Sequence, residues 1–294
     1  MILVTGAGGF VGRNLVTRLA GEGVRGLVRD RAASAPVDGV ELVEGDVTRP
    51  ETLGPVLEGV EVVVHCAAIT GDRRQPYRGA YDAVNRVGTA NVVRAAESVG
   101  AQRIVLLSGL GTRPGRRRSY MATRWGMEEA VRASPLSYAI LRPSVLFGRG
   151  APLIRALAGL VRSAPVVPVL APRCRLQPLW VEDLVSCLAL AAREDRWDGR
   201  AIALGGGEQL DMSVLMRAIV EGLGVRRALV PMPPALAAVP ARAMTLALSR
   251  PPLTPAALEL LSFDNVAEPD VCRSEFGVDA AGFRDHVQRC GLEL

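Results

Sequence analysis

The sequence predicts an α/β fold in which a doubly wound parallel sheet is joined to a smaller C-terminal α/β subdomain. Short apolar runs alternate with amphipathic stretches through the first half of the chain, which is the rhythm of repeated β-α-β units. A glycine-rich turn lies directly between the first apolar run and the first amphipathic stretch. Near residue 150 prolines become frequent and the rhythm breaks. We therefore expect a sheet domain over 1–150 and a subdomain over 151–294 that is interwoven with the sheet.

The elements expected in the sheet domain follow one another as strand, helix and strand. Residues 60–65 form a continuous apolar run, typical of a parallel strand buried on both faces. Pro50, behind Thr48 as a candidate cap, indicates a helix over 50–57. Further strands are expected at 2–5, 24–29, 40–43, 104–107 and 138–141, and further helices after the glycine turn, at 80–99 and at 120–133. In the second half, helices at 182–193 and 212–222 enclose a strand at 201–204.

The composition is that of a globular protein. Hydrophobic residues make up 49% of the 294 positions and charged residues 22%. No uncharged apolar run reaches the ~18 residues of a membrane span, and no basic segment precedes the first apolar run, so neither a transmembrane helix nor a secretory signal is expected. The five cysteines are widely spaced without a Cys-x-x-Cys pair, which predicts a reduced, cytoplasmic protein. His65 and His286 are isolated, so no metal site is expected.

The chain is basic, with a net charge of +5, and all 35 of its Lys+Arg residues are arginine. Such a balance favours anionic partners. The densest run, residues 113–118, holds four arginines but no interleaved aromatic side chain, so a nucleic-acid partner is not expected. The run is either a solvated loop or a contact with a phosphate or an acidic partner.

The glycine-rich turn predicts a Rossmann-like dinucleotide site. Gly6, Gly9 and Gly12 form a G-x-x-G-x-x-G pattern, and Phe10 and Val11 start the following helix. Small residues let the backbone approach a pyrophosphate, while the helix N-terminus supplies N–H donors and the positive end of its dipole. The alternative is a tight turn without a ligand.

Arginines near the second strand favour NADP over NAD. Arg29 and Asp30 follow that strand, and Arg13 lies in the first turn of the first helix. A carboxylate at this place would bind the adenine ribose hydroxyls of NAD, whereas an arginine pairs with the 2′-phosphate of NADP. We predict NADP, with NAD as the second choice. In the alternative, Arg29 and Arg31 face solvent around a ribose-binding Asp30.

Two further segments follow strands at the sheet edge where ligands bind. Asp46 and Val47 come after the third strand, where they would contact the adenine ring; Asp46 could equally be a loop or cap residue. Ala67 and Ala68 come after the fourth strand and leave room for a cofactor, unless they are ordinary packing residues.

Ser108, Tyr120 and Arg124 form the candidate catalytic set. Tyr120 and Arg124 are spaced i, i+4 and so share one face of the expected helix, and Ser108 ends the strand before it. Tyrosine is a general acid/base when a nearby cation supports it, and serine can orient a substrate. A lysine four residues after the tyrosine could supply this cation. Arg124 is bulkier than a lysine and is always charged, so it is not an equivalent replacement. The alternative is therefore an inactive cofactor binder.

These motifs resemble the extended or atypical short-chain dehydrogenase/reductase superfamily. Residues 84–91 are similar to its fourth-helix signature, and residues 141–148 to its sixth-strand signature. The resemblance implies that Gly6, Gly9, Gly12, Arg13 and Arg29 bind the cofactor and that Tyr120 lies by the nicotinamide ribose. The full set of predicted cofactor-binding residues also includes Phe10, Val11, Asp46, Val47, Ala67, Ala68, Arg124 and Pro143. Arg124 departs from the Tyr-x-x-x-Lys pattern of that superfamily.

A finer resemblance is to the NADPH-binding accessory subunit of complex I and its bacterial relatives. It is carried by residues 107–111, 175–183, 253–254 and 264–266. It implies an accessory or regulatory NADP(H)-binding protein with little turnover, partnered by a membrane-associated respiratory complex. The alternative is an active NADP-dependent reductase or epimerase acting on a quinone, isoprenoid or nucleotide-sugar-like substrate.

Residues 234–249 form an apolar stretch whose opposite face is thin in charge. A surface helix normally has a clearly polar face. The stretch is therefore expected either to be buried in its own subdomain or to dock on a partner or an anionic membrane surface. The second option would place a cytoplasmic protein peripherally on the inner face of the membrane.

Overall fold

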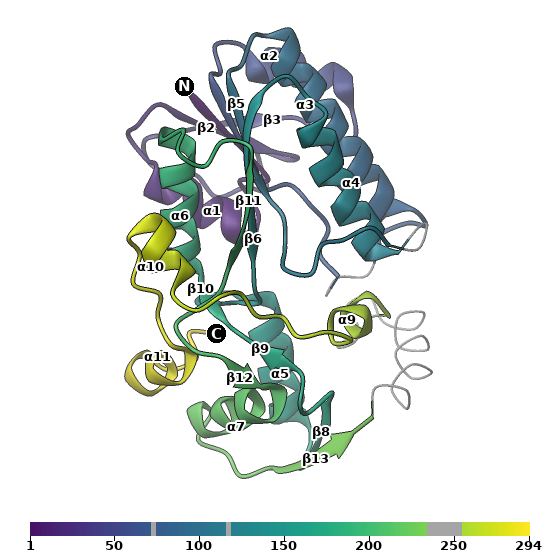
Figure 1. Cartoon of the computed structure of the whole chain (residues 1–294), viewed down its shortest axis with the longest axis vertical. Helices are drawn as coiled ribbons and strands as arrows, with labels where there is room; N and C mark the ends of the chain where they lie inside the picture. Colours follow the sequence, from purple (N-terminus) through teal and green to yellow (C-terminus); the bar gives the residue numbers. More distant parts are fainter. Residues whose placement is uncertain (72–74, 116–118, 234–254) are drawn as a thin grey trace. The chain divides into compact units, whose positions relative to one another are not determined.

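The computed structural model describes residues 1–71, 75–115, 119–233 and 255–294 (Figure 1). The chain divides into two compact units. The first comprises Met1–Ile69, Gln75–Arg142 and Leu184–Ile202, and the second Thr70–Arg74, Pro143–Asp183 and Ala203–Leu294. Residues 184–202 thus return to the first unit after the chain has entered the second.

A seven-stranded sheet forms the centre of the first unit, which confirms the predicted fold class. Its strands are β1 (Ile2–Thr5), β2 (Val24–Val28), β3 (Val40–Glu44), β4 (Val62–His65), β5 (Arg103–Leu107), β6 (Ser137–Pro143) and β11 (Arg200–Leu204). They are ordered β11-β6-β5-β4-β1-β2-β3, and every pair from β3 to β6 is parallel. The strand order reverses between β1 and β4, the position at which doubly wound sheets bind ligands.

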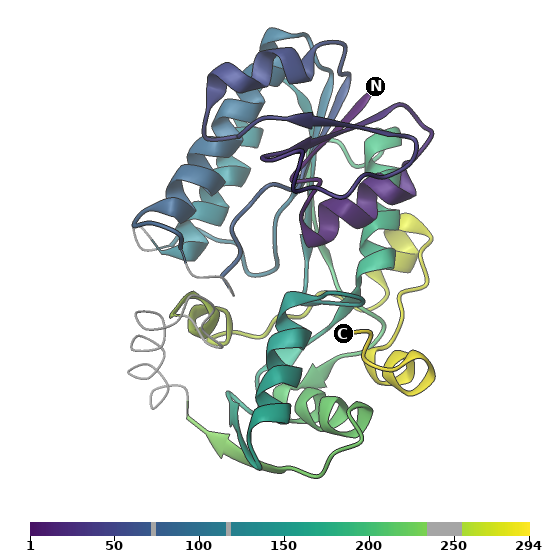
Figure 2. The same cartoon turned by 180° about the vertical axis from the view of Figure 1, so that it is seen from behind.

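Helices cover both faces of this sheet. One face carries α1 (Phe10–Arg18) and α6 (Val181–Arg193), and the other carries α2 (Leu53–Leu57), α3 (Gly88–Ser98) and α4 (Tyr120–Arg132) (Figures 1 and 2). Apolar side chains on both faces bury the central strands, so that Leu3, Val4, Val63 and Val64 have no exposed surface.

Two expected helices are divided. The expected helix at 80–99 begins with a π-helical turn, η2 (Asp82–Val87), and continues as α3. The expected helix at 50–57 begins as a 3-10 turn, η1 (Pro50–Thr52), and continues as α2. The expected cap was wrong: Arg49 precedes the 3-10 turn, and the N–H and hydroxyl of Thr48 both donate to the carboxylate of Asp46.

The second unit is built from short elements. Its helices are α5 (Pro152–Ser163), α7 (Met212–Gly222), α9 (Pro255–Leu260), α10 (Val271–Phe276) and α11 (Phe283–Cys290). Three two-stranded sheets pair β7 (Leu146–Phe147) with β10 (Leu179–Trp180), β9 (Arg175–Leu176) with β12 (Leu210–Asp211), and β8 (Val166–Leu170) with β13 (Ala228–Met232).

Buried polar groups hold the second unit together. The hydroxyl of Ser144 donates to Asn265, and the Nε2 of Gln177 donates to the Gly206 carbonyl oxygen 2.9 Å away. The Ala267 N–H donates to the Oε1 of Gln177 at 2.8 Å. Residues distant in sequence are thus joined within this unit by side-chain amides and a hydroxyl.

Three regions named above lie outside the described residues. These are the stretch at 234–249, the 253–254 pair and residues 116–118 of the arginine run. Within the described ranges, no helix is both long and apolar enough to cross a membrane.

Candidate functional site

The glycine turn between β1 and α1 depends on two glycines for its shape. Gly6 has φ +68, and a Cβ there would lie 2.9 Å from the Cα and N of Ala67. A Cβ on Gly12 would lie 2.2 Å from the carbonyl oxygen of Gly6. Gly9 is exposed and has a φ of −83, which is open to any residue; a Cβ there would lie 3.1 Å from the Gly6 carbonyl oxygen, a milder contact. Gly6 and Gly12 therefore set the fold of the turn, while Gly9 leaves its outer surface open.

The first turn of α1 is free to bind an anion. Its N-cap Gly9 forms no side-chain cap, and the turn contains no acidic residue. The N–H groups of Phe10, Val11 and Gly12 lack carbonyl partners within the helix, as in every first helical turn. These donors, together with the helix dipole, fit the pyrophosphate of a dinucleotide.

A cavity of about 280 Å³ adjoins the turn within the first unit. It is lined by Ala7 and Gly8 of the turn, Arg13 of α1, and Ser34 and Ala35 of the loop after β2. The Nη1 of Arg13 donates to the Ala35 carbonyl oxygen at 2.8 Å, so the arginine stem spans one side of the cavity. The cavity thus brings a guanidinium and a hydroxyl to the expected place of the adenine ribose.

Arg29 and Asp30, the two residues that follow β2, lie in different environments. The Oδ1 of Asp30 accepts a hydrogen bond from the Ala33 N–H at 3.0 Å, so this carboxylate caps the loop. Arg29 is exposed at the end of the strand. The arrangement leaves Arg29 and Arg13 as the cations available to a phosphate here.

Asp46 and Val47 are placed by hydrogen bonds that the sequence did not reveal. The Oδ1 of Asp46 accepts from both the N–H and the hydroxyl of Thr48, each at 2.8 Å. Val47 is buried, and its carbonyl oxygen accepts from the Nδ2 of Asn91 at 2.9 Å. Asp46 therefore acts locally as a turn cap, and its expected contact with the adenine ring stays a prediction.

Asn85 holds the chain that follows β4. Its Oδ1 accepts from the Ile69 N–H at 2.8 Å, and its Nδ2 donates to the Ile69 carbonyl oxygen at 3.1 Å. The Ala67 N–H donates to the hydroxyl of Thr5 at 3.2 Å. Asn85 and Asn91 were missed as site residues; the available signal was an amide on the apolar face of a helix.

His65, the last residue of β4, is buried with a defined tautomer. The Thr89 hydroxyl donates to the Asn85 carbonyl oxygen at 2.5 Å, so it accepts from the His65 Nε2 2.9 Å away. The His65 Nδ1 is then the acceptor for the Thr5 hydroxyl at 2.7 Å. Burial, and next the charge of Arg124, lower the pKa of His65 to about 3. The ring is therefore neutral.

Tyr120 and Arg124 share one face of α4. Tyr120 is 8% exposed, and its ring meets that of Tyr81 edge-on at a centroid distance of 5.3 Å. Its hydroxyl forms no hydrogen bond with the described part of the chain. Arg124 is 6% exposed; its Nη2 donates to the Leu107 carbonyl oxygen at 3.3 Å, and its Nη1 lies 3.8 Å from the sulfur of Met127. The buried Arg124 cation thus contacts only neutral groups, and it lies one helical turn from a tyrosine whose hydroxyl has no partner among the described residues.

Ser108 belongs to a buried ionic network. Its hydroxyl donates to the Oε1 of Glu128 at 2.5 Å. The Glu128 carboxylate has no exposed surface and also accepts from Arg142 and Arg132. Burial opposes its ionisation, but the hydrogen bonds from Arg142 and Ser108 outweigh burial and lower the pKa of Glu128. The Ser108 proton is committed to Glu128, and its expected role in orienting a substrate stays a prediction.

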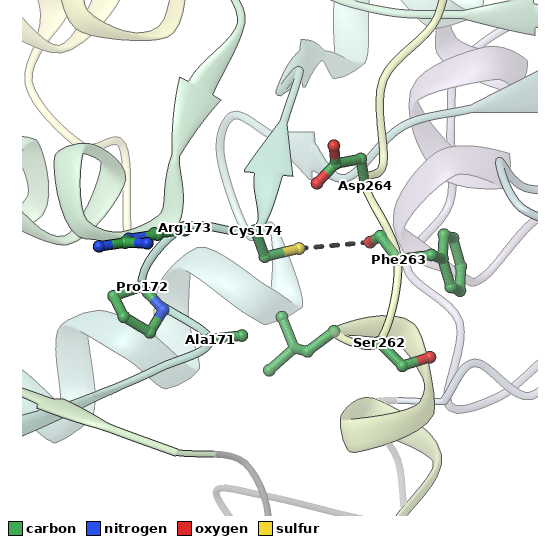
Figure 3. Close-up of a pocket in the computed structure, with 8 residues that line it drawn as sticks. Ala171, Pro172, Arg173, Cys174, Ser262, Phe263 and Asp264 are labelled. Carbon is green, nitrogen blue, oxygen red and sulfur yellow. Dashed lines mark hydrogen bonds between the residues drawn. The ribbon is translucent and has the colours of Figure 1, made fainter.

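Two features lie in the second unit. Pro143 is buried directly after Arg142 at the end of β6. A separate hollow of about 330 Å³ is lined mainly by apolar side chains, including Ala171, Leu261 and Phe263 (Figure 3). In it, the Cys174 thiol donates to the Phe263 carbonyl oxygen at 3.3 Å. Across the described residues of both units, no three His, Cys, Asp or Glu side chains converge as metal ligands.

A known protein family matches the sequence of most of the first unit. The sequence model of a family described as NAD(P)H-binding matches residues 6–157, more than half of the chain. The chain belongs to this NAD(P)H-binding family. The match begins at the first glycine of the turn and includes Tyr120 and Arg124.

Two enzymes are similar to this NAD(P)H-binding protein in sequence. Ceramide reductase of Caulobacter vibrioides is 34% identical over 199 residues, which are 66% of this chain and 61% of the reductase. A 3 beta-hydroxysteroid dehydrogenase/Delta 5→4-isomerase of Mycobacterium tuberculosis is 28% identical over 258 residues, 76% of this chain and 70% of the dehydrogenase. The match to the reductase thus leaves more than a third of its length uncovered.

Proteins with lower sequence identity share this fold. UDP-glucose 4-epimerase of Thermus thermophilus, solved with NAD, superposes with a TM-score of 0.73 at 20% identity, covering 100% of this chain and 96% of the epimerase. The NAD(P)H-binding protein therefore shares the fold of this epimerase.

Proposed function

We propose that this NAD(P)H-binding protein is an oxidoreductase that uses NADP(H) to interconvert a carbonyl and a secondary alcohol. The proposal is supported mainly by the arrangement of Tyr120 and Arg124 on α4. Tyr120 has a hydroxyl without a partner among the described residues, and the Arg124 guanidinium one turn later meets only neutral groups. A tyrosine beside an unpaired cation is suited to give and take a proton.

In this proposal, different residues bind the cofactor, transfer the proton and position the strand ends. The free N–H groups of α1 and the open surface at Gly9 would hold the pyrophosphate. Tyr120 would hold the proton that the substrate oxygen receives during reduction, and Arg124 would bind the ribose hydroxyls and stabilise a tyrosinate. The bound dinucleotide would supply the hydride. Asn85 and His65 keep the ends of β4 and α3 in place through their buried hydrogen bonds.

Three observations support NADP rather than NAD. Arg13 lines the cavity beside the glycine turn, and Arg29 is exposed at the end of β2. The nearby carboxylate of Asp30 is engaged as a loop cap. Two cations suit a 2′-phosphate better than free ribose hydroxyls, and one oxygen of the Asp30 carboxylate is already occupied by the loop.

The sequence relatives support an apolar substrate. Their names state activity on ceramide and on 3 beta-hydroxysteroids, which are lipophilic molecules that carry an alcohol or a carbonyl. We propose a substrate of this class.

A second function is supported by Arg124 itself. Arginine in place of lysine crowds the ribose and cannot share its proton, which suits an accessory protein that holds NADP(H) with little turnover, docked on a membrane-associated respiratory complex. Such a protein would gain stability from the cofactor, roughly 3 kcal/mol at a hundredfold excess over Kd.

Turnover separates the two functions. The purified chain is mixed with NADPH and a panel of long-chain and steroid ketones, and loss of NADPH absorbance is followed. Oxidoreductase function predicts turnover that Tyr120→Phe lowers about a hundredfold or more, while NADPH binding is retained. Binding without turnover on the whole panel would support the accessory role, and turnover unaffected by Tyr120→Phe would contradict the proposed chemistry.

A further inference from the structure

The topology of the sheet decides which half of a dinucleotide meets Arg124. In doubly wound sheets the dinucleotide crosses the carboxyl ends of the strands, with one half on each side of the point where the strand order reverses. That point lies between β1 and β4. The glycine turn follows β1, so the adenosine half belongs above β1 to β3. The nicotinamide half, by the proposed function, belongs above β4 and β5.

The Arg124 guanidinium lies at those two strand ends. Its Nη2 is 3.3 Å from the carbonyl oxygen of Leu107, the last residue of β5. Its charge also acts on His65, the last residue of β4, whose pKa is lowered first by burial and then by this charge. The cation therefore lies at the strand ends where the nicotinamide half, with its ribose and ring, is expected.

The charge on Arg124 is not compensated by its surroundings. It is only 6% exposed, and none of the described carboxylates lies within ion-pair distance of it. Glu128, one turn further along α4, is engaged by both Arg142 and Arg132. Glu128 is thus shared by two guanidinium groups, of which Arg132 also pairs with the exposed Glu129, and neither carboxylate forms an ion pair with Arg124.

We infer that Arg124 makes the site selective for the reduced form of the cofactor. The nicotinamide ring of NADP⁺ carries a positive charge, whereas the ring of NADPH is neutral. A fixed guanidinium in a site shielded from water repels the charged ring alone, and salt screens this repulsion weakly. NADPH is expected to bind on the order of tenfold more tightly than NADP⁺. The inference rests on the proposed function, because that function places the nicotinamide half of the cofactor beside Tyr120 and Arg124.

Titration calorimetry with three ligands tests this selectivity. The full chain is titrated with NADPH, with NADP⁺ and with adenosine 2′,5′-bisphosphate, which lacks the nicotinamide. Arg124→Gln should reduce the preference for NADPH to near unity while leaving the affinity for the bisphosphate unchanged, which also shows that the variant folds. Arg124→Lys keeps the charge and should keep the preference. Arg18→Gln, an exposed arginine in the last turn of α1, is the matched control and should behave as the unaltered chain.

The outcomes are distinguishable from failure of the proposed function. Equal affinities of the unaltered chain for NADPH and NADP⁺ would overturn the inference while leaving dinucleotide binding intact. A preference that survives in Arg124→Gln would overturn it as well. A chain that binds none of the three ligands would overturn the proposed function, and the inference with it.

Discussion

The two ends of the proposed cofactor site are built on different principles. At the glycine turn the backbone would bind the cofactor: Gly6 and Gly12 allow the chain to close on itself, and α1 offers its free N–H groups. At the ends of β4 and β5 side chains would bind it, and Tyr120 and Arg124 depend on buried partners for their placement. A backbone site is fixed by local sequence, whereas a side-chain site depends on residues distant in the chain. The following predictions test this difference, from the largest effect to the smallest.

The largest loss of stability is expected at the side-chain end. Glu128→Gln removes the charge that three donors share in a buried site. Leaving Arg142 without a counter-charge should cost about 3–5 kcal/mol of unfolding free energy, as for other buried ion pairs, while Arg132 keeps its pair with Glu129. Denaturant unfolding measures the loss. Arg49→Gln, in an exposed pair with Glu51, is the control and should change stability by less than about 1 kcal/mol. A similar effect of both variants would contradict the importance of burial.

At the backbone end, Gly12→Ala should destabilise the chain by about 3 kcal/mol, because overpacking cannot be relieved where a Cβ would lie 2.2 Å from the Gly6 carbonyl oxygen. Gly9→Val is the matched variant. Gly9 has an ordinary φ and is exposed, and a Cβ there would lie 3.1 Å from the Gly6 carbonyl oxygen, a milder contact than the one at Gly12. We expect Gly9→Val to fold yet gain no thermal stability from NADPH. Normal stabilisation by NADPH in Gly9→Val would show that the turn is not the phosphate site.

Acid should weaken the chain through His65. The pKa of this buried ring is about 3 in the folded chain, compared with the ordinary value of 6.5 that applies in the unfolded chain. The unfolded chain therefore binds more protons, and the stability that is present above pH 6.5 is lost as the pH falls toward 3. By pH 5 the loss is about 2 kcal/mol. Unfolding free energies at pH 7 and pH 5 measure it. The His65→Asn variant, although weaker at both pH values, should show a smaller difference between them; an unchanged difference would exclude His65 as its source.

The smallest effect expected is that of Arg29→Ala on cofactor choice. Loss of a charged hydrogen bond to the 2′-phosphate should weaken NADPH binding by about 1.5 kcal/mol or more, roughly tenfold. NADH binding should hardly change. Calorimetric affinities that fall equally for both nucleotides would contradict a role for Arg29 at the 2′-phosphate.

The sheet and the glycine turn could be predicted from sequence because their signals are local. The apolar run before His65 and the spacing of Gly6, Gly9 and Gly12 each determine structure within a few residues. The expected strands of the first unit were found within two residues of their predicted ends. Gly9 shows the limit of the pattern: its place in the motif does not reveal that its φ is ordinary and that the tighter contact with the Gly6 carbonyl oxygen is at Gly12.

The rest of the site could not be predicted, because it depends on pairs far apart in the sequence. Nothing near Ser108 shows that its proton goes to Glu128, 20 residues later. Asn91 reaches Val47 across 44 residues. The π-helical turn before α3 likewise has no composition that separates it from an ordinary helix. Such contacts follow from the assembled sheet, which brings the ends of β5, α4 and β6 together.

The buried guanidinium of Arg124 also changes which reagents can reach the chemistry of the site. A lysine there could form an imine with a carbonyl compound and be trapped by borohydride, or be modified by an active ester. This chain has no lysine side chain at all, so neither treatment can modify the site through that position. Dicarbonyl compounds such as phenylglyoxal react with guanidinium groups instead. For a group only 6% exposed, their attack will be slower than on exposed arginines such as Arg18 and Arg29.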